Sequence, residues 1–262
     1  MTWRGDWALV TGASSGIGKE FAMQLASAGF NLAVVARRVE LLEALAQDLR
    51  TKYHIKVFVV GHDLTHPNAP AVVRARLNEA GICIRLLVNN AAVGKWGRFE
   101  IVAAEEYDSI LQLNNQALVG LCREFFPCLS SFPRSAVVNI SSQAAFQPVP
   151  FMAVYAASKA FVHSFSLALY EEWKKYGIYV QTLIPGPTTT EFDEKAGAYA
   201  SSLSERRPAS EAVAIALKHL ASDEPMVSSA KGLYKQRAFG ALAPPQMVLT
   251  AVAKMFRPPD ER

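Results

Sequence analysis

The sequence predicts one α/β domain over residues 1–262, built on a doubly wound parallel sheet of about seven strands with helices on both faces. Short β-branched runs alternate along the chain with longer segments whose apolar residues recur at helical spacing. The short runs are apolar throughout, which is typical of parallel strands buried on both faces. Neither a linker rich in Ser, Gly or charge nor an internal repeat divides the chain.

The positions of the elements follow from this alternation. We expect strands at residues 7–11, 31–36, 57–60, 86–89, 136–140 and 179–184. We expect helices at residues 16–28, 39–52, 70–80, 104–114, 117–130, 153–176, 210–221 and 246–256. The polar segment 188–208, which is rich in small residues, is typical of a mobile loop over a site. The last forty or so residues are the least readable part of the pattern.

Composition excludes several classes of protein. The chain is 51% hydrophobic, so it is not disordered, and its net charge of +4 is too small to indicate nucleic-acid binding. No apolar run approaches the roughly 18 residues of a membrane-spanning helix, and the N-terminus does not resemble a signal peptide. We therefore expect a cytoplasmic protein. Its three cysteines (Cys83, Cys122 and Cys128) form no metal-binding spacing, so we expect three reduced thiols and no metal.

A glycine-rich turn follows the first predicted strand and opens the first helix. Its glycines are Gly12, Gly16 and Gly18, and Ser14, Ser15 and Ile17 lie between them. Gly12 permits a sharp turn, Gly16 lets the backbone approach a pyrophosphate, and Gly18 lets the helix pack closely on the sheet. The helix N-terminus offers free N–H groups to phosphates. This strand–turn–helix context predicts a dinucleotide site.

Two arginines at the end of the second strand favour NADP(H) over NAD(H). An acid at such a strand end would bind the ribose hydroxyls, whereas Arg37 and Arg38 suit a 2′-phosphate. After the third strand, Asp63 and Leu64 are candidates to flank the adenine. Spacing alone leaves Asp63 equally well explained as a cap of a loop or helix.

A tyrosine and a lysine stand four residues apart at the start of the helix 153–176. Tyr155 and Lys159 therefore lie on one helix face, where the cation can lower the phenol pKa from its usual value of about 10. A phenol tuned in this way can exchange a proton with a carbonyl or alcohol oxygen. Ser142 follows the fifth strand, whose carboxyl end faces the same crevice, and could hold a substrate oxygen.

Together these motifs resemble the short-chain dehydrogenase/reductase family over about residues 5–195. The resemblance implies a Rossmann fold and hydride transfer between nicotinamide and a carbonyl or alcohol carbon. It implies that Tyr155 is the catalytic acid/base and that Ser142 donates to the substrate oxygen. It also implies that Lys159 lowers the pKa of the tyrosine and binds the nicotinamide ribose. It assigns Asn114 to a water-mediated proton relay, with Asn115 as the competing candidate. Further cofactor contacts are implied at Asn90, Ala91, Ala92, Pro185, Gly186, Thr188 and Thr190.

The resemblance also divides the chain and predicts its assembly. Residues 5–190 would form the cofactor-binding and catalytic core, and residues 188–262 a substrate lid with C-terminal helices. Helices of this family often pair, so we expect a homodimer or homotetramer. The chain departs from the family in one place, since Ala92 stands where glycine is usual. At negative φ the cost is small, whereas at positive φ alanine is strained by roughly 1 kcal/mol.

Substrate identity is poorly specified by the sequence. Trp96, Phe146, Val149 and Phe192 are candidates for an apolar pocket that suits a hydrophobic ketone, aldehyde or 3-oxoacyl substrate. Packing in the core or lid explains each of them equally well. The helix 246–256 has an apolar face that a membrane surface, a dimer or a substrate could use, although packing on its own domain is the favoured explanation.

Two functions follow from these motifs. The first is an NADPH-dependent carbonyl reductase acting on a small molecule. The second is an NADP(H)-binding sensor on the same scaffold with little catalysis. The presence of Ser142, Tyr155, Lys159 and Asn114 together favours the reductase, because a pure binding protein needs no tuned tyrosine.

Overall fold

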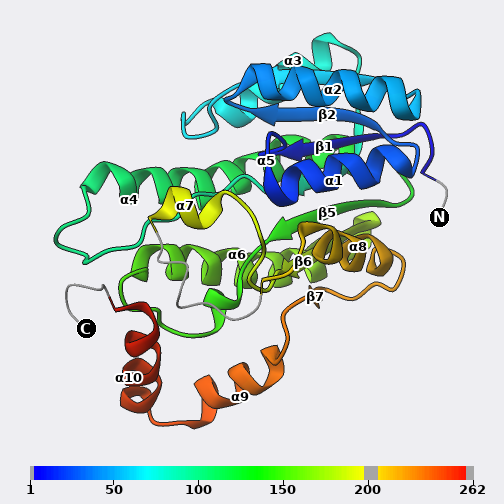
Figure 1. Ribbon diagram of the computed structural model, residues 1–262. Helices are drawn as coiled ribbons and strands as arrows, with labels where there is room; N and C mark the ends of the chain where they lie inside the picture. The colour runs from blue at the N-terminus through cyan, green and yellow to red at the C-terminus, as the bar shows by residue number, and fades with distance from the viewer. Residues whose placement is uncertain (1–2, 198–205, 258–262) are drawn as a thin grey trace.

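A seven-stranded parallel sheet lies at the centre of the computed structural model, which describes residues 3–197 and 206–257 (Figure 1). Its strand order is β3-β2-β1-β4-β5-β6-β7. The strands are β1 (Trp7–Thr11), β2 (Asn31–Ala36), β3 (Val57–Gly61), β4 (Ile84–Asn89), β5 (Ser135–Ile140), β6 (Ile178–Ile184) and β7 (Met226–Ser228). The predicted doubly wound fold is confirmed, and six strands lie within two residues of their expected positions.

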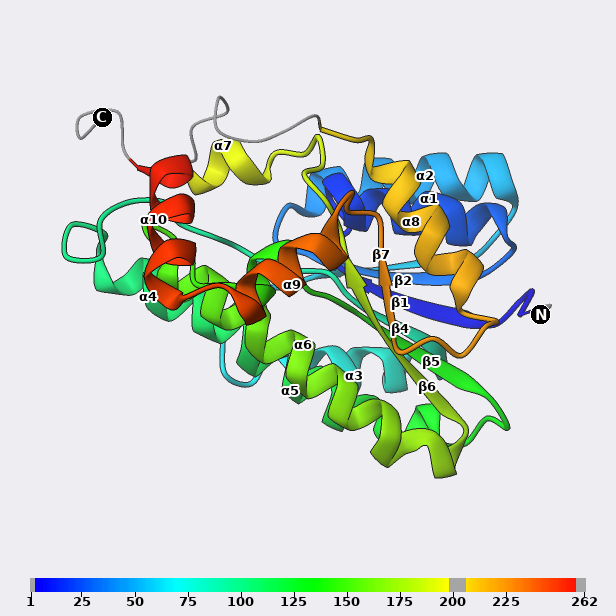
Figure 2. The ribbon, with the colours of Figure 1, turned by 90° about the horizontal axis from the view of Figure 1, so that it is seen from below.

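Helices cover both faces of this sheet (Figure 2). One apolar core lies beneath α1 (Gly16–Ser27), α2 (Val39–Tyr53) and α8 (Ala209–His219). The other lies beneath α3 (Ala69–Glu79), α5 (Leu118–Leu129) and α6 (Ala153–Trp173). All residues of β5 and β6 are buried, as the apolar runs predict for strands covered on both faces.

Short helical turns connect several of these elements. The helix α4 (Ala104–Leu111) continues through a π-helical turn, η1 (Gln112–Ala117), directly into α5. The 3-10 turn η2 (Gln143–Phe146) follows β5, and η3 (Lys174–Tyr176) ends α6. The two helices expected at 104–114 and 117–130 are therefore one uninterrupted helical segment with a π turn in the middle.

The chain after β6 forms the segments that lie beyond the carboxyl end of that strand. The predicted loop 188–208 contains a short helix, α7 (Phe192–Ala196), and a bridge that joins Thr188 to Arg207, while residues 198–205 lie outside the described part. Two further helices, α9 (Leu233–Leu242) and α10 (Pro245–Phe256), stand away from the sheet (Figures 1 and 2). Among the described helices, none combines the length and the apolar character needed to cross a bilayer.

The cysteines differ from their expected state. Cys83, just before β4, and Cys128, near the end of α5, form a disulfide with a Cα–Cα distance of 5.7 Å, whereas Cys122 is a buried free thiol. The expectation of three reduced thiols was therefore wrong. The pair is 45 residues apart in sequence, and only the packing of α5 beside β4 brings the two residues together.

Candidate active site

The glycine-rich turn between β1 and α1 has the conformation that its residues predict. Gly12 and Gly16 have φ values of +66° and +55°, which side-chain-bearing residues rarely adopt. A Cβ on Gly18 would lie 2.3 Å from the carbonyl oxygen of Gly12, so only glycine permits this approach of α1 to the turn. A Cβ on Gly16 would lie 3.1 Å from Thr190, so the segment after β6 lies directly against this glycine-rich turn (residues 12–18), which we call the phosphate cradle.

Asn90 holds this turn from the end of β4. Its side-chain amide donates to the carbonyl oxygens of Thr11 at 2.9 Å and Gly12 at 3.4 Å. The backbone N–H groups of Asn90 and Ala91 donate to the Thr11 hydroxyl at 2.9 and 3.0 Å. These bonds join β1 to β4 where the strand order reverses, which is the position of the ligand crevice in such sheets.

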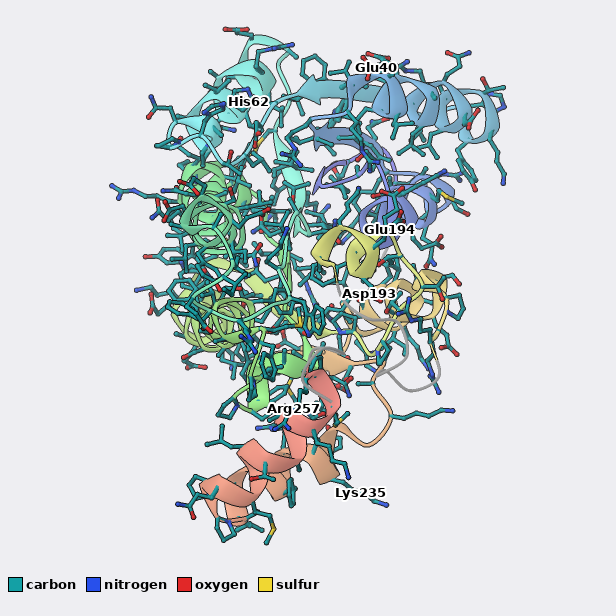
Figure 3. All side chains as sticks on the ribbon, turned by 60° about the vertical axis from the view of Figure 1, so that its left-hand side comes forward. Glu40, His62, Asp193, Glu194, Lys235 and Arg257 are labelled. Carbon is teal, nitrogen blue, oxygen red and sulfur yellow. A yellow bond between two sulfur atoms is a disulfide. The ribbon has the colours of Figure 1, made fainter. Side chains whose placement is uncertain are left out.

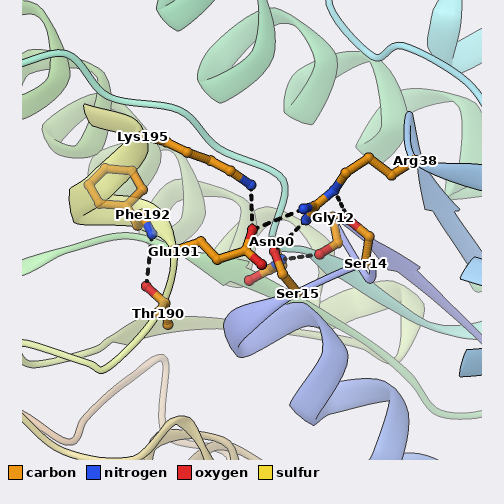
Figure 4. Close-up of polar contacts among 9 residues, drawn as sticks. All are labelled: Gly12, Ser14, Ser15, Arg38, Asn90, Thr190, Glu191, Phe192 and Lys195. Carbon is orange, nitrogen blue, oxygen red and sulfur yellow. Dashed lines mark hydrogen bonds and ion pairs between the residues drawn. The ribbon is translucent and has the colours of Figure 1, made fainter. Parts of the chain in front are cut away.

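Arg38 is the cation that reaches the cradle (Figure 4). One terminal nitrogen, Nη2, donates to the hydroxyls of Ser14 at 3.0 Å and Ser15 at 2.9 Å. The other, Nη1, forms an ion pair with the Glu191 carboxylate at 3.0 Å. Lys195 pairs with the same carboxylate. Both cations hold the pKa of Glu191 below its usual value, and Lys195 has the larger effect.

Arg37 points elsewhere. Its guanidinium lies 3.6 Å from a carboxylate oxygen of Asp63. The other oxygen of Asp63 accepts hydrogen bonds at 2.9 Å from the backbone N–H and the hydroxyl of Thr65. Burial raises the pKa of Asp63, but the Thr65 bonds and the Arg37 charge outweigh it and hold that pKa below its usual value. Asp63 therefore caps this turn, and Leu64 beside it is buried.

Tyr155, Ser142 and Lys159 meet at the carboxyl end of β5. The Ser142 hydroxyl is close enough to Tyr155 to lower its pKa, and it accepts the backbone N–H of Ala144 at 3.2 Å, which begins η2. Lys159 is buried, and its ammonium donates to the carbonyl oxygen of Ile140 at 2.9 Å. The ammonium lies 5.9 Å from the centroid of the Tyr155 ring. The predicted trio is thus brought together by α6, β5 and η2.

The acid–base character of this trio is set by burial. Removal from water raises the pKa of Tyr155 to about 12, against a smaller lowering by the Ser142 bond, and the Asp193 charge raises it further. Burial also lowers the pKa of Lys159 to about 8. In this arrangement the expected lowering of the tyrosine pKa is absent, because desolvation outweighs the other influences; the Phe192 ring of α7 lies against the phenol at a centroid distance of 5.2 Å.

Asn114 lies in the π turn and is fully enclosed. Its side chain bonds in both directions with the backbone of Val93, at 2.9 Å each way, and donates to the Ser158 hydroxyl at 2.9 Å. Asn115 donates instead to the Ser158 carbonyl oxygen at 2.9 Å. Both asparagines therefore fasten the segment 112–117 to α6, and Asn114 alone also holds the loop after β4. The assignment of a proton relay to Asn114 stays a prediction.

Comparison with known proteins identifies the family. The sequence profile described as short chain dehydrogenase matches residues 6–200, about three quarters of the chain. The chain belongs to the short-chain dehydrogenase family. The matched region contains the glycine turn, Asn90, the π turn and the Ser142–Tyr155–Lys159 trio of this short-chain dehydrogenase.

Relatives and solved structures agree with this placement. The chain is 30% identical over 187 residues to the very-long-chain 3-oxoacyl-CoA reductase of Bos taurus, covering 70% of this chain and 59% of that protein. It thus spans little more than half the length of the curated relatives that it matches. A short-chain dehydrogenase from Sphingobium yanoikuyae in complex with NADPH has 35% identity and a TM-score of 0.81, covering 88% and 91% of the two chains. A bulky-bulky ketone specific alcohol dehydrogenase from Comamonas testosteroni has 33% identity and a TM-score of 0.76, covering 86% of each chain.

The predicted pocket residues of this short-chain dehydrogenase converge only in part. Trp96 and Val149 lie in one apolar cluster with Tyr155, and Phe192 covers the same tyrosine from α7. Phe146 is not part of this cluster, and its ring packs instead on His163 at 4.7 Å and beneath the Arg237 guanidinium at 4.9 Å. The same cluster includes Met152 and, from the helix 246–256 whose apolar face the sequence predicts, Val248, Val252 and Phe256; sequence reasoning missed only its member Ala156 among these.

The departure from the family glycine at Ala92 causes no backbone strain. Within the described ranges, the non-glycine residues with positive φ are His54, Phe151 and Asp223, so Ala92 is not one of them. The less costly of the two alternatives therefore holds. After β6, the hydroxyl of Thr188 donates to the Gly186 carbonyl at 2.8 Å, and that of Thr190 accepts the N–H of Phe192 at 3.3 Å. Both threonines thus shape the segment that follows Pro185.

Proposed function

We propose that this short-chain dehydrogenase uses NADPH to reduce a hydrophobic ketone, aldehyde or 3-oxoacyl substrate. The observation that carries the proposal is the placement of Tyr155. Its phenol is close enough to Ser142 for that hydroxyl to lower its pKa, lies beside the buried Lys159 and forms part of an apolar cluster. An acid–base group against an apolar wall with few polar partners is what carbonyl reduction of a hydrophobic molecule requires.

The residues at the strand ends fit a dinucleotide cofactor. The positive-φ glycines leave room for a pyrophosphate at the N-terminus of α1, where N–H groups point outward. Arg38 stands beside Ser14 and Ser15 with a charge suited to a 2′-phosphate. When bound, the nicotinamide supplies the hydride. Residues Asn90, Thr188 and Thr190 shape the groove along which this cofactor would lie.

The protonated phenol can supply the proton that reduction of a carbonyl requires. With its pKa raised to about 12, Tyr155 carries its proton at neutral pH and can donate it to a carbonyl oxygen. Ser142 is placed to hold that oxygen as negative charge develops on it. Lys159, with a pKa lowered to about 8, exchanges protons readily near neutral pH and can restore the proton of Tyr155. The reverse reaction would first require the tyrosine to ionise.

The substrate class follows from the wall around Tyr155. Apart from Tyr155 and the indole N–H of Trp96, which donates to the Phe256 carbonyl at 2.8 Å, this cluster is apolar. A Bos taurus relative is named a very-long-chain 3-oxoacyl-CoA reductase, and a similar structure is described as specific for bulky-bulky ketones. Both names agree with a long or bulky apolar carbonyl compound.

The test is turnover of NADPH and NADH with a panel of aromatic aldehydes, steroid ketones, diketones, 3-oxoacyl thioesters and sugars. We expect NADPH-selective reduction of one hydrophobic class, and at least a thousandfold loss in Tyr155→Phe with cofactor binding retained. Activity that is unchanged in Tyr155→Phe would refute the assigned role. Tight NADPH binding without turnover on the whole panel would favour the sensor function instead.

We also propose that two copies associate through α5 and α6. A groove of about 430 Å³ runs between these helices and is lined by Val119, Arg123, Phe126, Phe165, Leu169 and Trp173. Phe161 and Leu167 of α6 are exposed as well. Light scattering should give a multiple of the chain mass, which Phe161→Glu should reduce.

A further inference from the structure

The helix α9 has an apolar side turned to solvent. The side that packs on the body of the protein carries the buried Leu233, Gln236, whose amide donates to the Gln143 carbonyl at 3.2 Å, and Gly240, where a Cβ would lie 3.1 Å from the Phe146 carbonyl oxygen. The opposite side carries Tyr234, Ala238, Ala241 and Leu242, which span about 100° of the helix. Packing of α9 on its own domain accounts for Leu233 but not for this second, exposed apolar side.

The exposure on this side is extreme for apolar residues. Leu242 is 85% exposed and Tyr234 is 76% exposed. Met247, at the start of α10, is also exposed, and Pro244 and Pro245 lie between the two helices. Leu242 and Met247 therefore flank the turn of the α9–α10 hairpin (residues 233–256), which projects away from the sheet in Figure 1.

The charge of this region has one sign. From residue 225 to residue 257 the sequence contains five basic residues (Lys231, Lys235, Arg237, Lys254 and Arg257) and no acidic residue. Lys235 and Lys254 are exposed, on α9 and α10 respectively. Figure 3 shows Lys235 extending outward from the end of the molecule formed by these helices. The whole chain has a net charge of only +4, so this segment is locally basic.

The exposed apolar side chains and the basic charge together indicate what binds to this surface. A second copy related by a twofold axis through this face would bring lysines against lysines, with no carboxylate in the segment to pair with them. An anionic lipid surface accepts both the apolar side chains and the flanking cations. We propose that the α9–α10 hairpin docks on the surface of an anionic phospholipid bilayer, with Leu242, Tyr234 and Met247 inserted among the headgroups.

Docking would place the membrane beside the substrate wall. The inner side of α10 contributes Val248 and Val252, which are buried against Val149 and Met152 in the cluster that contains Tyr155. One helix therefore has the substrate wall on one side and the proposed lipid contact on the other. A hydrophobic carbonyl compound dissolved in the bilayer could then reach the site along this helix. This last step rests on the proposed function, whereas the docking itself does not.

The test is sedimentation of the full chain with vesicles, at low and high salt. One set consists of phosphatidylcholine alone, and the other of a two-to-one mixture of phosphatidylcholine and phosphatidylserine. We expect the protein to sediment with the mixed vesicles at low salt, and with neither set at high salt. Lys235→Gln and Lys254→Gln should each weaken binding about fivefold, because each cation near such a surface contributes roughly that factor.

Leu242→Glu should abolish binding, and Leu41→Glu serves as its control. Leu41 is an exposed leucine of α2, at the opposite end of the molecule. Because Leu242 has almost no contacts to lose, its variant should keep the thermal midpoint and the turnover of a water-soluble carbonyl compound. Absence of binding to mixed vesicles, or equal binding by Leu242→Glu, would overturn the proposal. So would a Leu242→Glu variant of lower molecular mass, since the surface would then be an interface between copies.

Discussion

Replacing Glu191 by glutamine should tighten the binding of NADPH. Glu191 forms an ion pair with Arg38 at 3.0 Å (Figure 4). Of the two arginines that follow β2, Arg38 is the one that contacts the phosphate cradle, through the hydroxyls of Ser14 and Ser15. A 2′-phosphate would compete with this carboxylate for the same guanidinium. Glutamine keeps the size of the side chain and removes its charge, so the competition weakens.

The magnitude follows from the exposure of the ion pair. The two side chains are 37% and 44% exposed, and ion pairs in such settings contribute about 0.2–1 kcal/mol. This free energy is lost when Arg38 turns to the phosphate, so its removal should lower the dissociation constant by about 1.4-fold to 5-fold. The gain should shrink as salt is raised, because exposed charges are screened.

The assay is calorimetric titration of NADPH and NADH into wild type, Glu191→Gln and Glu194→Gln. Glu194 is an exposed acid of α7 and supplies the matched control for the loss of one negative charge. NADH lacks the 2′-phosphate and should bind both variants as it binds wild type. Weaker NADPH binding by Glu191→Gln would refute the reasoning, as would an equal gain with NADH or an equal gain in Glu194→Gln.

Three further outcomes follow from the site and the fold. Ser142→Ala should lower turnover by about a hundred- to a thousandfold with an unchanged dissociation constant for NADPH, since it removes a hydrogen bond to the reacting oxygen; a change in cofactor affinity alone would contradict this. Reduction of the Cys83–Cys128 disulfide, which closes a 45-residue separation, should lower the free energy of unfolding by about 2–4 kcal/mol. Thiol titration of the denatured, unreduced chain should then count Cys122 alone. Because burial lowers the pKa of Lys159 from 10.5 to about 8, the unfolded chain binds more protons between these values. Urea titrations should therefore show that the difference in free energy of unfolding, wild type minus Lys159→Met, rises from pH 8 to pH 10.5. A constant difference would argue against the burial of this charge.

The strands could be predicted because their environment is simple. The strands β1, β2, β4, β5 and β6 are buried almost throughout, and the edge strand β3, although only partly buried, is still an apolar run, so such a run is enough to reveal each of the six. The seventh, Met226–Ser228, has three residues and pairs only with β6, which leaves no periodicity to detect. The helix α9 escaped prediction because it has apolar residues on two sides: Tyr234 and Leu242 face solvent, while the packed side combines Leu233 with Gln236 and Gly240.

The catalytic residues could be predicted because their spacing is local. Tyr155 and Lys159 lie one helical turn apart, and Ser142 follows the strand directly before that helix. Contacts between distant segments carry no such signal. Glu191 lies 153 residues after Arg38, and the cysteines of the disulfide are 45 residues apart. Nothing in the order of the residues indicates either pair, because both depend on how the sheet brings β2, β4 and the segment after β6 together.

The same distinction explains the difference between the predicted and the observed state of Tyr155. Helical spacing predicts that Lys159 lies near the phenol, and it does, at 5.9 Å from the ring centroid. Spacing does not predict that Phe192 of α7 lies against the ring, or that the phenol is partly buried. Desolvation then outweighs the other influences and raises the pKa to about 12. The segment that carries Phe192 also carries Glu191, so one short stretch of chain contacts both the tyrosine and Arg38. Movement of that stretch would change the proton affinity of the phenol and the charge available to a phosphate at the same time.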